Sequence, residues 1–140
     1  PQISTKYSER LRNYSRIAET ITRISEVRHG NYLAFFPSFD FLEQVFLHLK
    51  APKNFTVIKQ SKNMKNSEVE ETLDLLRSEE RPVLLLAVQG GIFSEGVDYP
   101  GNMVIGAFIV GPPLPSFDVE REIMKKYYED NYQEGYEYAY

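Results

Sequence analysis

The stretch Pro82–Gly101, PVLLLAVQGGIFSEGVDYPG, decides the fold that we expect for this chain of 140 residues. Its first part, Val83–Val88, is a continuous apolar run, which is typical of a strand buried on both faces of a sheet. A glycine-rich connection, Gln89–Gly101, follows, and the apolar run Met103–Val110 then predicts a second buried strand. Because glycine permits positive φ and close approach, this connection can offer backbone amides to a ligand.

Helical and extended patterns alternate along the rest of the chain. The predicted elements are a helix over Ser8–Val27, a strand at Tyr32–Phe36, a helix capped by Ser38, a strand at Phe55–Ile58, a helix opened by a capping box of Ser67 and Glu70, the two strands named above, and a final helix. Such alternation predicts an α/β fold, a mostly parallel sheet with helices on both faces. Ligands of such sheets bind at the carboxyl ends of strands, which here are Pro37–Phe39, Gln89–Gly101 and Gly111–Pro115.

Composition limits the classes of function. The chain is 42% apolar and 26% charged, as in a soluble globular domain, and it has no cysteine and only two histidines, so we expect no metal site in it. We find neither a membrane-spanning apolar run nor a signal-peptide pattern, so we expect a cytoplasmic (nucleoid-associated) or nuclear protein without a membrane partner. The formal net charge of −4 argues against a broad basic surface, so any contact with nucleic acid must be local.

Ser94, Glu95 and Asp98 stand among the glycines of Gln89–Gly101. They can line a binding loop, or Ser94 and Asp98 can merely close turns in a tight connection between two strands. A hydrolase nucleophile elbow, G-x-S-x-G, would need glycine where Ile92 stands. The chain also lacks a G-x-x-x-x-G-K-[ST] run, so it cannot cradle a triphosphate alone.

Two segments carry a resemblance to a known family. GIFSEGVDYPG after PVLLLAV resembles motif V of the XPD/DinG branch of the second helicase superfamily, and NYLAFFPSFDFLEQV resembles the region around its motif IV. The opening TKYSERLRNY and the later VGPPLPSFDVE resemble the entry to the second motor domain and the strand exit after motif V. The resemblance therefore implies that residues 1–140 are one RecA-like C-terminal motor domain of an ATP-dependent DNA helicase, P-loop NTPase-like in fold and truncated before motif VI.

The resemblance also implies a division of roles among five residues. Ser38, Ser94 and Glu95 match positions near the backbone of single-stranded DNA, whereas Gly96 and Asp98 match positions that face the nucleotide. This division is chemically sensible, because hydroxyls and backbone amides can hold phosphate oxygens, while a carboxylate suits the hydroxyl donors of a ribose.

The implied partners are single-stranded DNA, ATP and the N-terminal motor domain of the same protein, and the implied setting is DNA repair. ATP and Mg²⁺ would act in the complete enzyme, with the Mg²⁺ ligands outside this chain, and this family often carries an iron–sulfur cluster elsewhere. Two departures limit the resemblance: XPD-like members often have basic residues where Gly90 and Ile92 stand, and the arginines of motif VI are expected only beyond Tyr140. We therefore expect no catalytic residue, no bound cofactor and no ATP hydrolysis in the isolated chain.

Three further features keep alternative interpretations open. Four tyrosines at four-residue spacing can stack on bases or cover the core, namely Tyr128, Tyr132, Tyr136 and Tyr140. Lys59, Lys62 and Lys65 can contact DNA phosphates or belong to a solvated loop. The alternative function is a non-catalytic doubly wound module that binds a nucleotide or a protein through the loop after Val88.

Overall fold

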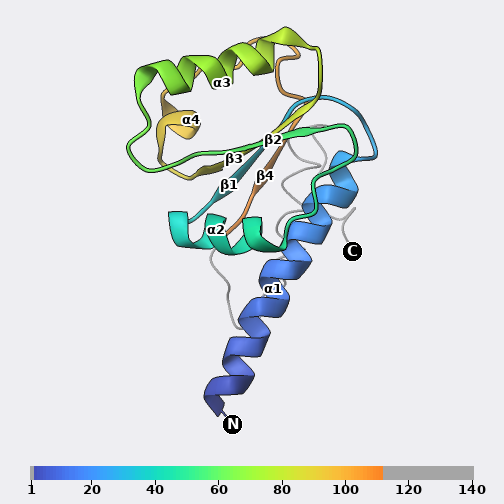
Figure 1. Ribbon diagram of the computed structural model, residues 1–140, viewed down its shortest axis with the longest axis vertical. Coiled ribbons are helices and arrows are strands. Elements are labelled where there is room, and N and C mark those ends of the chain that lie inside the picture. Colours follow the sequence, from blue (N-terminus) through green and yellow to red (C-terminus); the bar gives the residue numbers. More distant parts are fainter. Residues whose placement is uncertain (1, 112–140) are drawn as a thin grey trace.

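The structure is a computed structural model that describes residues 2–111, so the predicted final helix and the tyrosine-rich segment lie outside the described residues. The elements, in chain order, are α1 (Gln2–Ser25), β1 (Tyr32–Phe36), α2 (Phe39–His48), β2 (Thr56–Lys59), α3 (Asn66–Ser78), β3 (Val83–Val88), α4 (Ile92–Glu95) and β4 (Gly106–Ile109). Their alternation confirms the predicted α/β fold (Figure 1).

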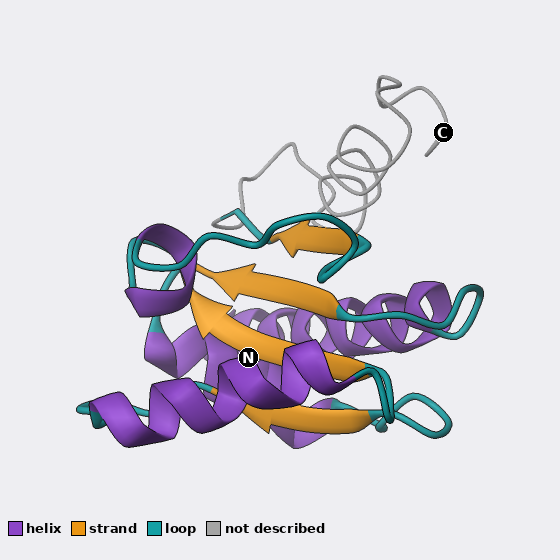
Figure 2. Cartoon of the chain, turned by 90° about the horizontal axis from the view of Figure 1, so that it is seen from above, coloured by secondary structure: helices purple, strands orange, loops and turns teal. Residues whose placement is uncertain are grey.

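The four strands form one sheet in the order β2-β3-β1-β4, and all of the pairings are parallel (Figure 2). The two central strands, β1 and β3, are buried along their whole length, which explains their uninterrupted apolar sequences. The prediction that Met103–Val110 is a strand buried on both faces is wrong. Only Gly106–Ile109 is extended, and its side chains alternate between buried and half-buried because β4 lies at the edge and pairs with β1 alone.

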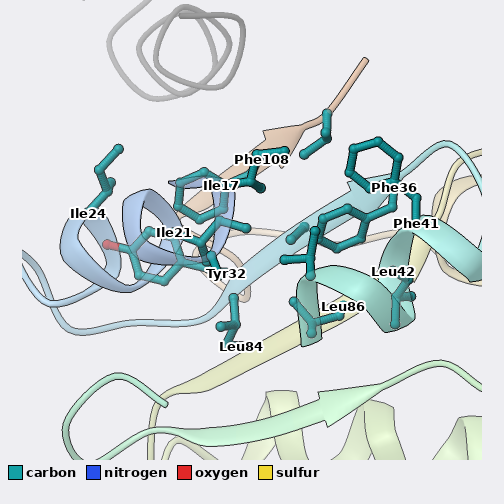
Figure 3. Close-up of a cluster of buried hydrophobic side chains, with 14 of the residues drawn as sticks. Ile17, Ile21, Ile24, Tyr32, Phe36, Phe41, Leu42, Leu84, Leu86 and Phe108 are labelled. Carbon is teal, nitrogen blue, oxygen red and sulfur yellow. The ribbon is translucent and has the colours of Figure 1, made fainter. Parts of the chain in front are cut away.

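Helices cover both faces of the sheet, as the sequence predicts (Figures 1 and 2). Alternate residues of β1 point to opposite faces, so Tyr32 and Phe36 join the core beneath α1 and α2, whereas Leu33 and Phe35 join the core beneath α3 and α4. Figure 3 shows the first of these cores, whose labelled members are Ile17, Ile21, Ile24, Tyr32, Phe36, Phe41, Leu42, Leu84, Leu86 and Phe108.

The first helix is longer than its apolar pattern indicates. It begins at Gln2 and ends at Ser25, and Val27, which the pattern included, is 79% exposed beyond the helix end. The amino-terminal part of α1 projects past the sheet (Figure 1). Within residues 2–111, no helix combines the length and the apolar character that crossing a bilayer requires.

One predicted helix cap is confirmed and the other is wrong. Ser38 caps α2, because its Oγ accepts a hydrogen bond from the backbone N–H of Phe41 at 3.1 Å. The capping box of Ser67 and Glu70 is not formed, since α3 already begins at Asn66 and both residues lie inside it. The Glu68 carboxylate instead accepts a hydrogen bond from the backbone N–H of Lys65 at 2.9 Å.

Asn31 holds the amino ends of the strands together. This buried side chain donates through Nδ2 to the carbonyls of Leu76 and Met103 at 2.8 and 2.9 Å, and its Oδ1 accepts from the N–H of Val83 at 2.8 Å. Its own carbonyl accepts from the N–H of Ile105 at 2.8 Å. One residue thereby joins the end of α3 to the starts of β1 and β3 and to the segment that enters β4.

Candidate functional site

The carboxyl ends of β1 and β3 lie side by side, because Phe36 pairs with Val88. Gln89 joins these ends to the edge strand: its N–H donates to the carbonyl of Phe36 at 2.8 Å, and its Nε2 donates to the carbonyl of Val110 at 2.7 Å. The glycine-rich connection and Ser38 therefore both lie at the carboxyl edge of the sheet, which is where parallel sheets bind their ligands.

Two glycines begin the connection for different reasons. Gly90 has a φ of 77°, a conformation that side chains disfavour. At Gly91 an added Cβ would lie 2.9 Å from Cγ2 of Val88, so the close packing there excludes a side chain. The turn leads into the short helix α4, which the sequence did not indicate and which begins at Ile92.

Apolar side chains anchor the rest of the connection to the α3 side of the molecule. Phe93 is fully buried in the core beneath α3, and the half-buried Val97 and Tyr99 pack against the same core. The Tyr99 hydroxyl donates to the carbonyl of Phe93 at 2.6 Å, and burial raises the pKa of Tyr99 from 10.0 to about 12. The backbone that carries the polar residues is thus held in place.

Ser94, Glu95 and Asp98 point away from that core and are exposed. Within residues 2–111, neither the Ser94 hydroxyl nor the Asp98 carboxylate forms a hydrogen bond or an ion pair. A turn closed by either side chain would require such a bond, so the described contacts do not support the interpretation that they only close turns. Both groups are available to a ligand.

Glu95 and Gly96 have more constrained surroundings. The Glu95 Oε2 atom lies 3.8 Å from the point that a Cβ on Gly90 would occupy, so this carboxylate stands over the glycine turn. Gly96 ends α4 with its N–H bonded to the carbonyl of Ile92 at 2.8 Å, and an added Cβ would lie 2.9 Å from that carbonyl oxygen. Gly96 therefore fixes the course of the backbone just before Asp98.

Ser38 lies across the sheet from these residues. It follows β1 and starts α2 on the α1 side, whereas Ser94 and Glu95 belong to α4 on the other face, and Gly96 and Asp98 lie further along the connection. Although its Oγ accepts the capping hydrogen bond, the exposed Ser38 hydroxyl keeps a proton to donate.

Sequence reasoning missed two glutamines at this edge. Gln89 ties three strands, as described above, and Gln60, which is 4% exposed, accepts from the N–H of Val88 through Oε1 at 3.1 Å. Its own N–H donates to the carbonyl of Leu86 at 2.8 Å. Each glutamine directly follows a strand, and that position was the signal that could have identified both.

Comparison with known proteins identifies the family. Residues 21–140 match the helicase C-terminal domain. Among similar proteins, the ATP-dependent DNA helicase CHL1 of Candida albicans is 28% identical over 89% of this chain, and that of Debaryomyces hansenii is 29% identical over 92%. A probable ATP-dependent helicase of Methanocaldococcus jannaschii is 31% identical over 81%.

This chain corresponds to 16%, 17% and 17% of the lengths of these three relatives, respectively. The family match agrees with the parallel sheet, and it favours the motor domain over a non-catalytic binding module. The chain therefore belongs to the helicase C-terminal domain family and is a RecA-like C-terminal domain of the XPD/DinG type.

Proposed function

We propose that this domain supplies one wall of an ATP cleft and one half of a single-stranded DNA track in an ATP-dependent DNA helicase. The observation that carries the proposal is the connection after β3, where the buried Phe93 and the half-buried Tyr99 hold the backbone while Ser94 and Asp98 are exposed and unpaired within the described residues. The relatives named as helicases support the same function.

On the DNA side, we assign phosphate contacts to Ser38 and Ser94. A hydroxyl donates to a phosphate oxygen without adding charge, which suits a chain whose formal net charge is −4. Glu95, which stands over Gly90, is an acceptor and repels phosphate, so we assign it to donor groups of the strand, such as the amino groups of bases.

On the nucleotide side, we assign Gly96 and Asp98. Asp98 fits a ribose, because its carboxylate is exposed, accepts hydrogen bonds and has no partner within residues 2–111. Gly96 fixes the backbone two residues before it. ATP, when bound with Mg²⁺, supplies the phosphoryl transfer that drives the motor.

Other parts of the complete protein must contribute the remaining groups. We propose that the N-terminal motor domain carries the P-loop and the Mg²⁺ ligands, and that closing and opening of the two domains alternates their grip on the strand. Any iron–sulfur cluster ligated by cysteine would lie in another part of the complete protein, since this sequence has no cysteine. The setting that we propose is DNA repair, on DNA in the nucleus or the nucleoid.

The test uses the full-length protein with Ser94→Ala, made alone and together with Ser38→Ala. We expect weaker binding of single-stranded DNA and weaker stimulation of ATP hydrolysis by DNA, with little change in nucleotide binding. Ser94→Ala is the cleaner change, because Ser38→Ala also removes a helix cap that contributes about 1 kcal/mol.

The matched control is Ser78→Ala, an exposed serine at the other end of the sheet. Equal DNA affinity of the Ser94→Ala and Ser78→Ala variants would refute the role of Ser94.

A further inference from the structure

The loop after β2 reaches the beginning of α2. In the sheet, β3 separates β2 from β1, so the segments that follow β1 and β2 need not meet. They do meet, because Nζ of Lys62 lies 5.8 Å from the ring centroid of Phe39, the residue directly after Ser38. An ammonium held over an aromatic face at this distance makes a weak cation–π contact. Lys62 thus contacts the residue next to Ser38, whose hydroxyl is assigned to the DNA track.

The neighbouring lysines have other roles. Nζ of Lys59 lies 2.7 Å from Oε1 of Glu43 and 4.3 Å from the centroid of the Phe46 ring, so its charge is already paired. The backbone of Lys65 takes part in the start of α3. Within residues 2–111 the exposed Lys62 has no ion pair, not even with Asp40 in the first turn of α2.

The base of this loop is anchored to the glycine-rich connection. Oε1 of Gln60 is held by the N–H of Val88, so the amide of this side chain has a defined orientation. Its Nε2 lies 3.2 Å from the point that a Cβ on Gly91 would occupy. The loop that carries Lys62 and the connection that carries Ser94 therefore pack against each other at the carboxyl edge.

We propose that Lys62 contacts a backbone phosphate of the single-stranded DNA next to the one held by Ser38; this inference rests on the proposed function. A phosphate needs positive charge or donors, and the other groups assigned to the track are hydroxyls and a carboxylate. Lys62 would supply a local cation in a chain of net charge −4, without a broad basic surface.

The experiment measures binding of a fluorescent oligothymidylate by the full-length protein over a series of salt concentrations, together with the KM for ATP without DNA. Lys62→Ala should lower the affinity at low salt about twofold to fivefold. The slope of log affinity against log salt should become shallower by about 0.7, the value for one lost phosphate contact on a single strand. Lys62→Arg should restore most of the affinity and most of the salt slope, and the KM for ATP should not change in either variant.

Lys53→Ala is the matched control, because this exposed lysine precedes β2 at the opposite edge and its removal changes the net charge equally. If Lys62→Ala matches Lys53→Ala in affinity and slope while Ser94→Ala weakens binding, the inference about Lys62 fails and the proposed function stands. A rise in the KM for ATP with unchanged DNA binding would assign Lys62 to the nucleotide instead and overturn the inference. No binding of oligothymidylate by the wild-type protein would overturn both.

Discussion

Asp98 is exposed on the connection between α4 and β4, and its carboxylate has no partner within residues 2–111. Asp98→Ala therefore removes no hydrogen bond from the described fold, and the free energy of unfolding should change by no more than about 0.5 kcal/mol. If the carboxylate accepts a hydrogen bond from a ribose hydroxyl, its loss should cost about 1.5 to 3 kcal/mol of nucleotide binding. The kcat/KM for ATP should then fall about tenfold to a hundredfold.

The assay uses the full-length protein and three measurements on one preparation: thermal unfolding, affinity for single-stranded DNA without nucleotide, and the kinetics of ATP hydrolysis. The control is Glu80→Ala, which removes an exposed carboxylate at the amino edge of the sheet. Only the kinetics of Asp98→Ala should differ from those of the control.

Two outcomes contradict the reasoning about Asp98. A lower melting temperature with normal activity per folded molecule would mean that Asp98 closes a turn after all. A kcat/KM equal to that of the Glu80→Ala variant would mean that the carboxylate does not meet the nucleotide.

Three further predictions concern the described fold and the limits of this chain. Asn31→Ala breaks two buried hydrogen bonds and one part-buried one and should lower the free energy of unfolding in urea by about 2 to 4 kcal/mol, whereas an unchanged midpoint would contradict the role of Asn31 at the amino ends of the strands. The pKa of Tyr99 is raised from 10.0 to about 12 on folding, so its contribution to stability is full below pH 10 and is lost as the pH rises toward about 12. Tyr99→Phe should therefore make the loss of stability over that range less steep, unlike Tyr7→Phe at an exposed position. Finally, the purified chain should be folded by circular dichroism and hydrolyse no ATP with or without DNA, because it has no P-loop lysine, and robust turnover by pure material would contradict the motor-domain interpretation.

The central strands could be predicted to the residue, and the edge strands could not. Tyr32–Phe36 and Val83–Val88 are buried on both faces, so no polar residue interrupts them and their limits are visible in the sequence. At the β4 edge, Met103 and Val110 are apolar because they pack against the cores, not because they pair within the strand. Apolar character alone does not distinguish these two causes.

Among the side-chain hydrogen bonds to the backbone, one between neighbours in the sequence could be predicted, and those between residues far apart in the sequence could not. Ser38 was recognisable because a serine before an apolar helix is a usual cap. At the start of α3, the backbone N–H of Lys65 donates to the Glu68 carboxylate, and lysine is not a residue type that indicates a helix start. Gln60 and Gln89 each directly follow a strand, but they bond to groups 28 and 21 positions away, so their partners depend on the strand order. The five predicted site residues came from the family resemblance, and their ligands stay predictions.

The hydrogen bonds of Asn31 hold the amino ends of the strands together, and this makes that end of the sheet a suitable place for a label. The turn after α3 is exposed at Glu79 and Glu80, and it lies at the edge opposite the Ser38 cap and the connection that carries Ser94. Because this sequence has no cysteine, the thiol of a Glu80→Cys variant would be the only one within these 140 residues for a fluorescent dye. Energy transfer from that dye to a second one on the proposed N-terminal motor domain would test whether the two domains open and close, with the label at the edge opposite both proposed ligand surfaces.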